Sequence, residues 1–163
     1  MTDPRSKYVP AAVRASWQQQ PSLNDQSPQR EKLRQKNQQE RLTIIAMMNK
    51  AGVPMMAGTD LGNPFVLPGF SLHDELALSV QASLSSGEAL KTATYNPAKF
   101  LGMLDRLATV EKGKLADLVL LNANPLDDIH NTQKIRAVIV NGIYLDRAAL
   151  QIVSCCCSVQ RQC

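Results

Sequence analysis

A short apolar run between two helical patterns constrains the fold of this chain more than any other feature. Before the run, Leu42, Ile45 and Met48 fall on one stripe of a helix expected over 31–50, and Gly52 follows where such a helix ends. The run itself, Val53–Ala57, is continuously apolar and too short for a helix. It therefore predicts a buried strand of a parallel sheet, and with the flanking helices an α/β fold.

The chain after this run continues as loop and helix. Residues 61–70 carry two Gly and two Pro and predict a loop. The next helix is expected to begin at Ser71, with Asp74 completing a capping box, and its buried stripe repeats every four residues. A second capping box, Ser85 to Glu88, opens another helix that reaches about Tyr95 before a Pro interrupts it.

The character of the sequence changes near residue 103. Residues 107–121 predict a strand, a Gly-containing turn and a strand, and Asn141-Gly142 predicts a hairpin within 135–145. The expected organisation has four parts: an irregular Gln- and Pro-rich lead-in (1–30), an α/β segment (31–103), a β-rich segment (104–150) and a Cys-rich disordered tail (151–163). Within the lead-in we expect at most one short helix, near Ala11–Gln18.

Charge and hydropathy argue against a nucleic-acid surface and a membrane span. The basic excess lies in residues 1–50, with nine Lys or Arg against four acids, but only Tyr8 and Trp17 could stack on bases and both precede the main basic run. We therefore expect the basic run to form a solvated helix face rather than a nucleic-acid surface. No apolar run reaches 18 residues, and the first residues lack the pattern of a signal peptide, so the compartment stays unassigned.

The four cysteines do not form a recognisable site. Cys155, Cys156, Cys157 and Cys163 all lie in the last nine residues. A disulfide framework would spread cysteines through the fold, and a zinc site would pair them at CxxC-like spacing. We therefore expect the tail to be unrelated to function.

Asp60 is the residue that physical chemistry alone singles out. A carboxylate at the polar end of a buried parallel strand, before a Gly- and Pro-rich loop, lies where α/β barrels keep their active sites. The alternative is that Asp60 only stabilises the following turn, as Asp often does.

The wider sequence around Asp60 resembles a known superfamily. The residues AGVPMMAGTD (51–60) and PGFSLHDEL (68–76) resemble the metal-dependent amidohydrolases, in particular the imidazolonepropionase-like and prolidase-like members. The resemblance continues through EAL (88–90), ATYNPA (93–98), LG (101–102), VEKGKLADLV (110–119), NPL (124–126), IVNG (139–142) and DR (146–147). It covers about residues 42–150, and Tyr8-Val-Pro10 with Trp17 resemble the loop that precedes this region.

The resemblance implies a fold and a chemistry. Its members are (β/α)8 TIM-type barrels joined to a small β-sandwich, so this chain is expected to be the C-terminal portion of a barrel followed by part of the sandwich. Asp60 resembles the aspartate that ends the eighth strand, which binds a divalent metal, zinc, and takes a proton from the metal-bound water. His73 matches the histidine of the family's Ser-Leu-His stretch and is expected near the substrate, although packing at a helix start explains it equally well.

The remaining matched residues are expected to be structural. Gly113 and Asp117 resemble residues that shape and stabilise a turn of the sandwich. Asp127, Asp128 and His130 have no spacing typical of a ligand set, so a solvated loop is expected there.

The chain lacks the family's other metal ligands, and two hypotheses follow. In the first, it is the C-terminal part of a hydrolase that cleaves a non-peptide or dipeptide-like C–N bond of a small amide substrate with metal-activated water. Its partner would be the missing N-terminal part, or the open strand edges would lead to self-association. In the second, it is an inactive remnant or an interaction module. Either way, Asp60 alone should hold no zinc, since a catalytic zinc needs about three protein ligands.

Overall fold

The computed structural model describes residues 3–19, 25 and 27–151 of the chain. These residues belong to two compact units, Met1–Ala93 and Thr94–Cys163. The units divide upstream of residue 103, where the sequence changes character. The predicted Cys-rich tail, from residue 152 onward, lies outside the described residues. Within the described part of the chain, no helix is both long and apolar enough to cross a membrane.

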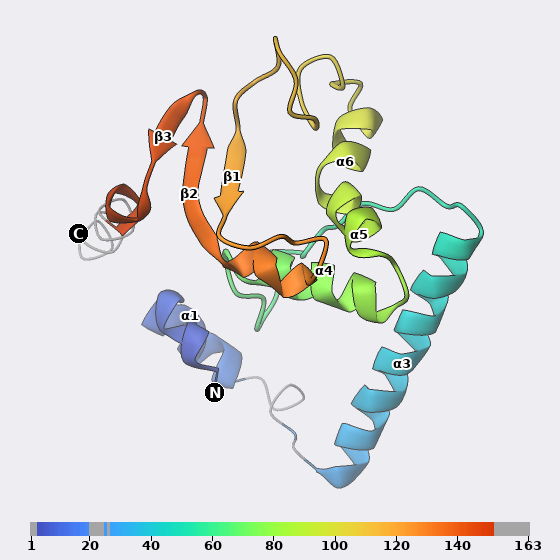
Figure 1. The fold of residues 1–163 in the computed structure, drawn as a ribbon. Helices are drawn as coiled ribbons and strands as arrows, with labels where there is room; N and C mark the ends of the chain where they lie inside the picture. The colour runs from blue at the N-terminus through green and yellow to red at the C-terminus, as the bar shows by residue number, and fades with distance from the viewer. Residues whose placement is uncertain (1–2, 20–24, 26, 152–163) are drawn as a thin grey trace. The chain divides into compact units, whose positions relative to one another are not determined.

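The first unit is built from helices and loops (Figure 1). Its elements are η1 (Pro4–Tyr8), α1 (Ala11–Gln18), α3 (Pro28–Lys50), α4 (Ser71–Gln81) and α5 (Ser86–Ala93). The short helix predicted near Ala11–Gln18 is confirmed as α1, whereas the 3-10 helix η1 was not predicted and α3 begins at Pro28, inside the lead-in expected over 1–30. Pro28 at the first turn costs the helix no hydrogen bond, and the Ser27 side chain accepts from the Arg30 N–H.

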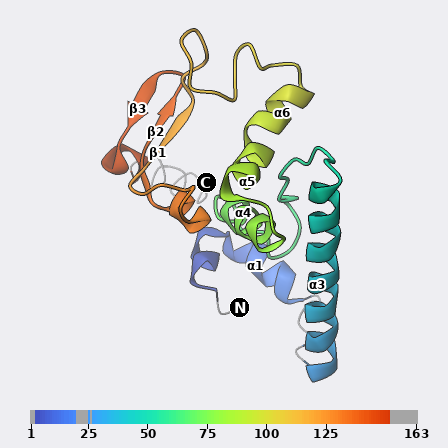
Figure 2. The same ribbon diagram turned by 45° about the vertical axis from the view of Figure 1, so that its right-hand side comes forward.

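Helix α3 is a long polar helix that packs only at its C-terminal end. Residues 28–41 are all exposed, as expected of a solvated face, and Leu42 is the buried residue of the helix. Figure 1 shows this N-terminal half projecting beyond α4 and α5, and Figure 2 shows the same projection from a second side. The helix ends as predicted, with Gly52 at a φ of 71°.

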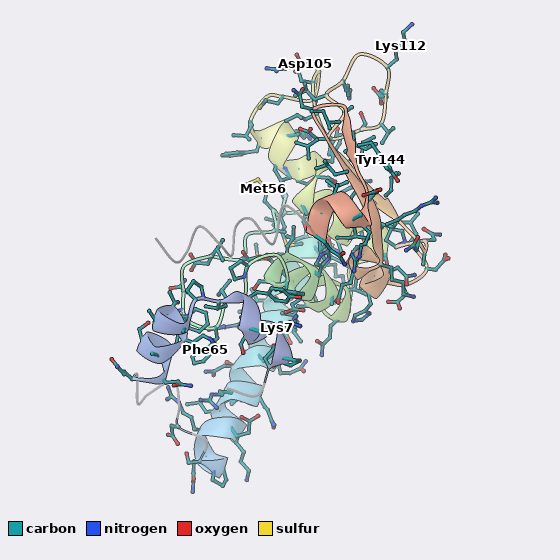
Figure 3. All side chains as sticks on the ribbon, turned by 90° about the vertical axis from the view of Figure 1, so that its left-hand side faces the viewer. Lys7, Met56, Phe65, Asp105, Lys112 and Tyr144 are labelled. Carbon is teal, nitrogen blue, oxygen red and sulfur yellow. The ribbon has the colours of Figure 1, made fainter. Side chains whose placement is uncertain are left out.

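The N-terminal segment packs on the loop that follows Asp60. Val9, Trp17 and Leu67 are buried together, with Phe70 packed against them. Trp17 also lies 5.4 Å, centroid to centroid, from the ring of Phe65, which Figure 3 places beside this segment. Apolar contact therefore fixes residues 3–18 against the Gly- and Pro-rich loop.

An ion pair reinforces this packing. Arg5 Nη1 lies 2.9 and 2.8 Å from the two carboxylate oxygens of Asp74, and the guanidinium stands over the ring of Phe70. The other side of Arg5 binds Asp3, which lowers the pKa of the Asp3 carboxyl below its ordinary value. The pair joins η1 to the first turn of α4.

The predicted strand at Val53–Ala57 is absent. Residues 53–60 form no regular element, and Val53 is 41% exposed. A strand exists only where a neighbouring strand pairs with its backbone, and the described residues provide none here. The apolar run was therefore read correctly as a segment between helices and wrongly as a paired, buried strand.

The two predicted capping boxes had different outcomes. At α5 the box is complete: the Glu88 N–H donates to Ser85 Oγ at 3.2 Å, and the Ser85 N–H donates to Glu88 Oε2 at 2.7 Å. At α4 the prediction was wrong, since Phe70 precedes the helix without a side-chain cap. Ser71 instead binds the Leu67 backbone, with its Oγ accepting from the N–H and donating to the carbonyl.

The second unit combines one helix with a small antiparallel sheet. Its elements are α6 (Tyr95–Phe100), β1 (Leu118–Leu121), η2 (Ile129–Gln133), β2 (Ile135–Val140) and β3 (Ile143–Leu145). The sheet order is β1-β2-β3, and a β-bulge interrupts the β1–β2 register between Leu120 and Leu121. Ala137, at the middle of β2, is fully buried. The helical break predicted at Asn96-Pro97 falls at Thr94 instead.

The hairpin prediction is confirmed, and the strand predicted early in 107–121 is not. Asn141 and Gly142 have φ values of 50° and 79°, the left-handed pair that joins β2 to β3 in a tight turn. Residues 107–117 are loop, with Gly113 at a φ of 92° as the turn prediction requires. Asp117 was expected to stabilise that turn, but its carboxylate accepts from the Asn141 N–H at 2.6 Å and fixes the hairpin instead.

Candidate functional site

Asp60 stands at the end of the irregular segment, in a turn that its own side chain helps to form. Its backbone has a φ of 55°, a conformation that Asp tolerates better than most residues. The Asn63 side-chain amide donates to Asp60 Oδ2, and the Asn63 N–H donates to the Asp60 carbonyl at 3.2 Å. Asp60 itself is exposed. The turn role that the sequence left open is therefore present, and it leaves the carboxylate accessible.

Two hydrogen bonds fix the residues just before Asp60. The Gly58 N–H donates to Glu75 Oε1 of α4 at 2.8 Å, and the Ala57 N–H donates to the carbonyl of Thr92 in α5 at 2.9 Å. The other Glu75 oxygen, Oε2, is buried and has no hydrogen-bond partner among the residues that the structure describes. Helices α4 and α5 thus hold the chain where the neighbouring strands of a sheet would otherwise do so.

The exposure of residues 54–60 alternates along the chain. Met55, Ala57 and Thr59 are half-buried, whereas the residues between them, and Asp60 at the end, are exposed. Met56, on the open side, is 49% exposed. Alternation with a period of two is typical of a strand that packs one face and leaves the other open. Asp60 belongs to the open face.

A cavity of about 350 Å³ lies between this segment and the helices of the same unit. Its walls come from α3, α4, α5 and the segment itself, and most of them are apolar. The lining residues are Ile45, Met48, Pro54, Met55, Met56, Ala57, Glu75, Ser79, Leu84 and Thr92. The packing of the segment on its helices is therefore incomplete.

His73 lies in the first turn of α4 and is half-buried. Burial lowers the pKa of its imidazole below the ordinary value of 6.5, and the adjacent Asp74 charge opposes that shift. The ring is therefore biased toward its neutral form, in which one nitrogen accepts a hydrogen bond. Both the substrate role and the packing role predicted for His73 fit this position.

The acidic loop near His130 is solvated, as expected. His130 Nδ1 lies 2.8 Å from Asp128 Oδ1, and both side chains are exposed. The His130 backbone N–H and then its ring lower the pKa of Asp128. Asp127 accepts from the Asn124 side chain. Within the residues that the structure describes, no group of three His, Cys, Asp or Glu side chains is placed to hold a metal.

Sequence reasoning missed Glu75 and Arg5. Glu75 lies in the quoted PGFSLHDEL stretch, but its bond to Gly58 joins residues 17 positions apart, and no local pattern announces it. The Arg5–Asp74 pair spans 69 positions. The turn between Asp60 and Asn63 could have been predicted, since Asp and Asn near Gly commonly form such turns.

Comparison with known proteins decides the family. The model of the amidohydrolase family matches residues 19–144, which is most of the chain. The chain belongs to the amidohydrolase family. Within it, the chain is imidazolonepropionase-like: it is 42% identical over 78 residues to the imidazolonepropionase of Pseudomonas syringae pv. tomato, and 31% identical over 83 residues to that of Thermoplasma acidophilum.

These matches cover 46% and 48% of this chain but only 19% of each relative. A 5-methylthioadenosine/S-adenosylhomocysteine deaminase of Teredinibacter turnerae is 32% identical over 95 residues, which are 53% of this chain and 22% of the deaminase. The chain therefore spans about a fifth of the length of the curated relatives it matches.

Solved amidohydrolase structures share the fold over a larger part of the chain. A bottromycin amidohydrolase superposes with a TM-score of 0.76 at 27% identity, covering 91% of this chain and 33% of its own. A Xaa-Pro dipeptidase with bound methionine superposes with a TM-score of 0.63 at 25% identity, covering 83% of this chain and 33% of the dipeptidase. These neighbours are TIM-barrel proteins, and the residues of this chain form helices and a small antiparallel sheet.

Amidohydrolases generally use divalent metals, and the described residues of this chain do not complete a site for one. A catalytic metal of this kind needs about three protein ligands. Asp60 offers one exposed carboxylate, already shared with Asn63, and no second or third ligand gathers around it in the described ranges. A metal site is therefore not complete within these residues.

Proposed function

We propose that this amidohydrolase-family chain contributes Asp60 to the active site of a hydrolase that cleaves a C–N bond in a small amide or dipeptide-like molecule. The carrying observation is the alternation over residues 54–60, which puts Asp60 at the end of an open face. In this proposal residues 53–60, which are unpaired here, take the last-strand position of a barrel once a strand from outside the described residues pairs with them, and residues 104–150 are part of a sandwich.

The role proposed for Asp60 is that of a proton acceptor. A carboxylate accepts a proton efficiently only when it is held close to the reacting group. The bonds from Gly58 to Glu75 and from Asn63 to Asp60 restrict its position without covering it. Asp60 would also be this chain's one ligand to a divalent metal, zinc in our proposal, with the other ligands supplied from outside the described residues.

The role proposed for His73 is contact with the substrate. Its imidazole lies in the first turn of α4, burial lowers its pKa, and the neutral form of such a ring can accept or donate one hydrogen bond to an amide. Such a contact affects substrate affinity more than the chemical step.

The short match to the relatives supports completion of the site from outside this chain. The imidazolonepropionases continue over roughly four-fifths of their length beyond the match, since 19% of each is covered. In a complete barrel the backbone edges of residues 54–60 would pair with neighbouring strands, and the open face would pack against the rest of the barrel. The same face would favour association of the chain with itself when that part is absent.

One observation favours a second candidate, an inactive remnant or interaction module. The described residues hold no ligand group of three, so they carry no metal centre by themselves. A remnant would retain the fold of the segment without selection for the carboxylate at Asp60.

A chimera separates the two candidates. The part of the Pseudomonas syringae imidazolonepropionase that the match leaves uncovered is fused to this chain, and hydrolysis of cyclic amides and dipeptides is assayed. The active-site proposal predicts turnover, and Asp60→Asn should reduce it by at least ~100-fold, the lower range for a positioned general base. The matched control is Asp105→Asn, which removes an exposed carboxylate in the second unit.

Folding is monitored by circular dichroism and thermal melting in each variant. A folded chimera that is inactive with Asp60 present favours the remnant. A chimera that is equally active with Asn at position 60 shows that the assigned role is wrong.

A further inference from the structure

A basic hollow in the second unit is separate from the site at Asp60. It lies where β2 begins, has a volume of about 430 Å³, and is lined by Asn122, Gln133, Lys134, Ile135, Arg136 and Arg147. Three of the six lining residues are cationic, two are amides, and none is acidic. Residues 94–163 hold eight Lys or Arg and six Asp or Glu, and three of the eight cations line this hollow.

The β-bulge explains why these residues converge. Leu120 pairs with Ala137, but Leu121 pairs with Ile135, so Arg136 is the extra residue on β2. A regular strand would send consecutive side chains to opposite faces. At a bulge the strand bends and a side chain is redirected, and here Lys134, Ile135 and Arg136 all line the same hollow.

Backbone contacts fix the same region. The Asn122 N–H donates to the Lys134 carbonyl at 2.9 Å, which holds the end of β1 against the start of β2. Arg147 Nη1 donates to the Ile135 carbonyl at 3.4 Å, which draws this guanidinium toward the strand. An arginine has five N–H donors, so others stay available to a ligand.

The nearby acids are engaged elsewhere. Lys134 is close enough to Asp128 to help lower the pKa of that carboxyl, but Asp128 binds the N–H and ring of His130. Asp146 accepts from the Ala149 N–H. Among the residues that the structure describes, Lys134, Arg136 and Arg147 make no ion pair within 4.0 Å.

We propose that this hollow binds the phosphate group of a small soluble molecule. Three like charges around one space repel each other, and a multiply charged oxyanion relieves that repulsion. Guanidinium groups match the oxygens of a phosphate in a bidentate manner, and the Asn122 and Gln133 amides add neutral donors. The volume leaves room for a small phosphate-bearing ligand, and the cations and amides around the hollow are exposed to solvent.

Equilibrium dialysis of the full 163-residue chain with pyrophosphate tests the proposal. The site variant is R136Q/R147Q. The matched control is R106Q/K112Q, which removes the same charge from exposed positions of the same unit outside the hollow, with Lys112 at the loop tip seen in Figure 3. K134Q is a milder second variant in case the first does not fold, and folding of each is followed by circular dichroism.

We expect saturable binding of pyrophosphate, with an affinity that the site variant lowers roughly tenfold or more and the control variant changes by less than about twofold. The two variants should differ because charge-assisted hydrogen bonds act only at the hollow, whereas long-range attraction depends on the net charge, which both variants lower equally. K134Q should weaken binding to an intermediate extent. Equal weakening by both double variants would mean that net charge alone attracts the anion and would overturn the site. So would an absence of saturable binding, or binding of an oligonucleotide without any binding of pyrophosphate.

Discussion

Replacing Leu67 with Ala should release the N-terminal segment from the loop after Asp60. Leu67 is 6% exposed and packs with Val9 and Trp17. A buried Leu→Ala change costs about 2–5 kcal/mol, and the low end applies to a small cluster that can partly collapse. The Arg5–Asp74 pair, whose side chains are 33% and 43% exposed, adds less than about 1 kcal/mol. It cannot by itself hold residues 3–18 in place.

Trp17 is the single tryptophan of the chain, so its fluorescence reports the docking directly. In L67A the emission should shift to longer wavelength and acrylamide should quench it more strongly, as the ring becomes solvated. The control is L72A, at a position 41% exposed on α4, which should leave emission unchanged. Emission and quenching in L67A identical to those of the parent chain would refute the packing argument.

Three further predictions follow from individual contacts. Burial lowers the pKa of His73, so the unfolded state binds its proton more tightly, and the free energy of unfolding should fall as pH drops below about 6.5. Urea unfolding at pH 5 and pH 8 measures this loss, which should be smaller in H73N than in the parent chain. An equal loss in both chains would contradict the assignment. Ser85→Ala removes the hydroxyl of the capping box and should cost about 1 kcal/mol, measured by denaturant unfolding, with Ser83→Ala outside the box as comparison. Gly142→Ala forces a Cβ into a φ of 79° and should cost roughly 1–3 kcal/mol; an unchanged unfolding midpoint would show that the turn relaxes.

Local chemistry explains what the sequence predicted well. The end of α3 at Gly52, the capping box at Ser85 and the hairpin at Asn141-Gly142 each depend on a few adjacent residues. Their backbone angles and side-chain bonds are decided within one turn of chain, so a single sequence is enough to predict them.

Predictions that needed a distant partner did not hold. Residues 53–57 have the composition of a buried strand, but pairing requires a second strand, and none of the described residues supplies one. Asp117 was assigned to the nearest turn, whereas its carboxylate binds Asn141, 24 positions away. In the candidate site, Asp60 is predicted first from its place after the apolar run and then from the family resemblance, and its catalytic role stays a prediction. Glu75 was missed, because its bond to Gly58 depends on how α4 packs.

Zinc binding by the chain alone tests whether the proposed site at Asp60 is completed from outside this chain. The measurement is equilibrium dialysis with zinc, using a chain in which the four cysteines are replaced by Ser so that thiols cannot contribute, with and without Asp60→Asn. We expect only weak binding that is the same in both chains, because one carboxylate cannot hold the metal. One tightly bound zinc per chain that disappears in the Asn variant would contradict it, since the site would then be complete in this chain.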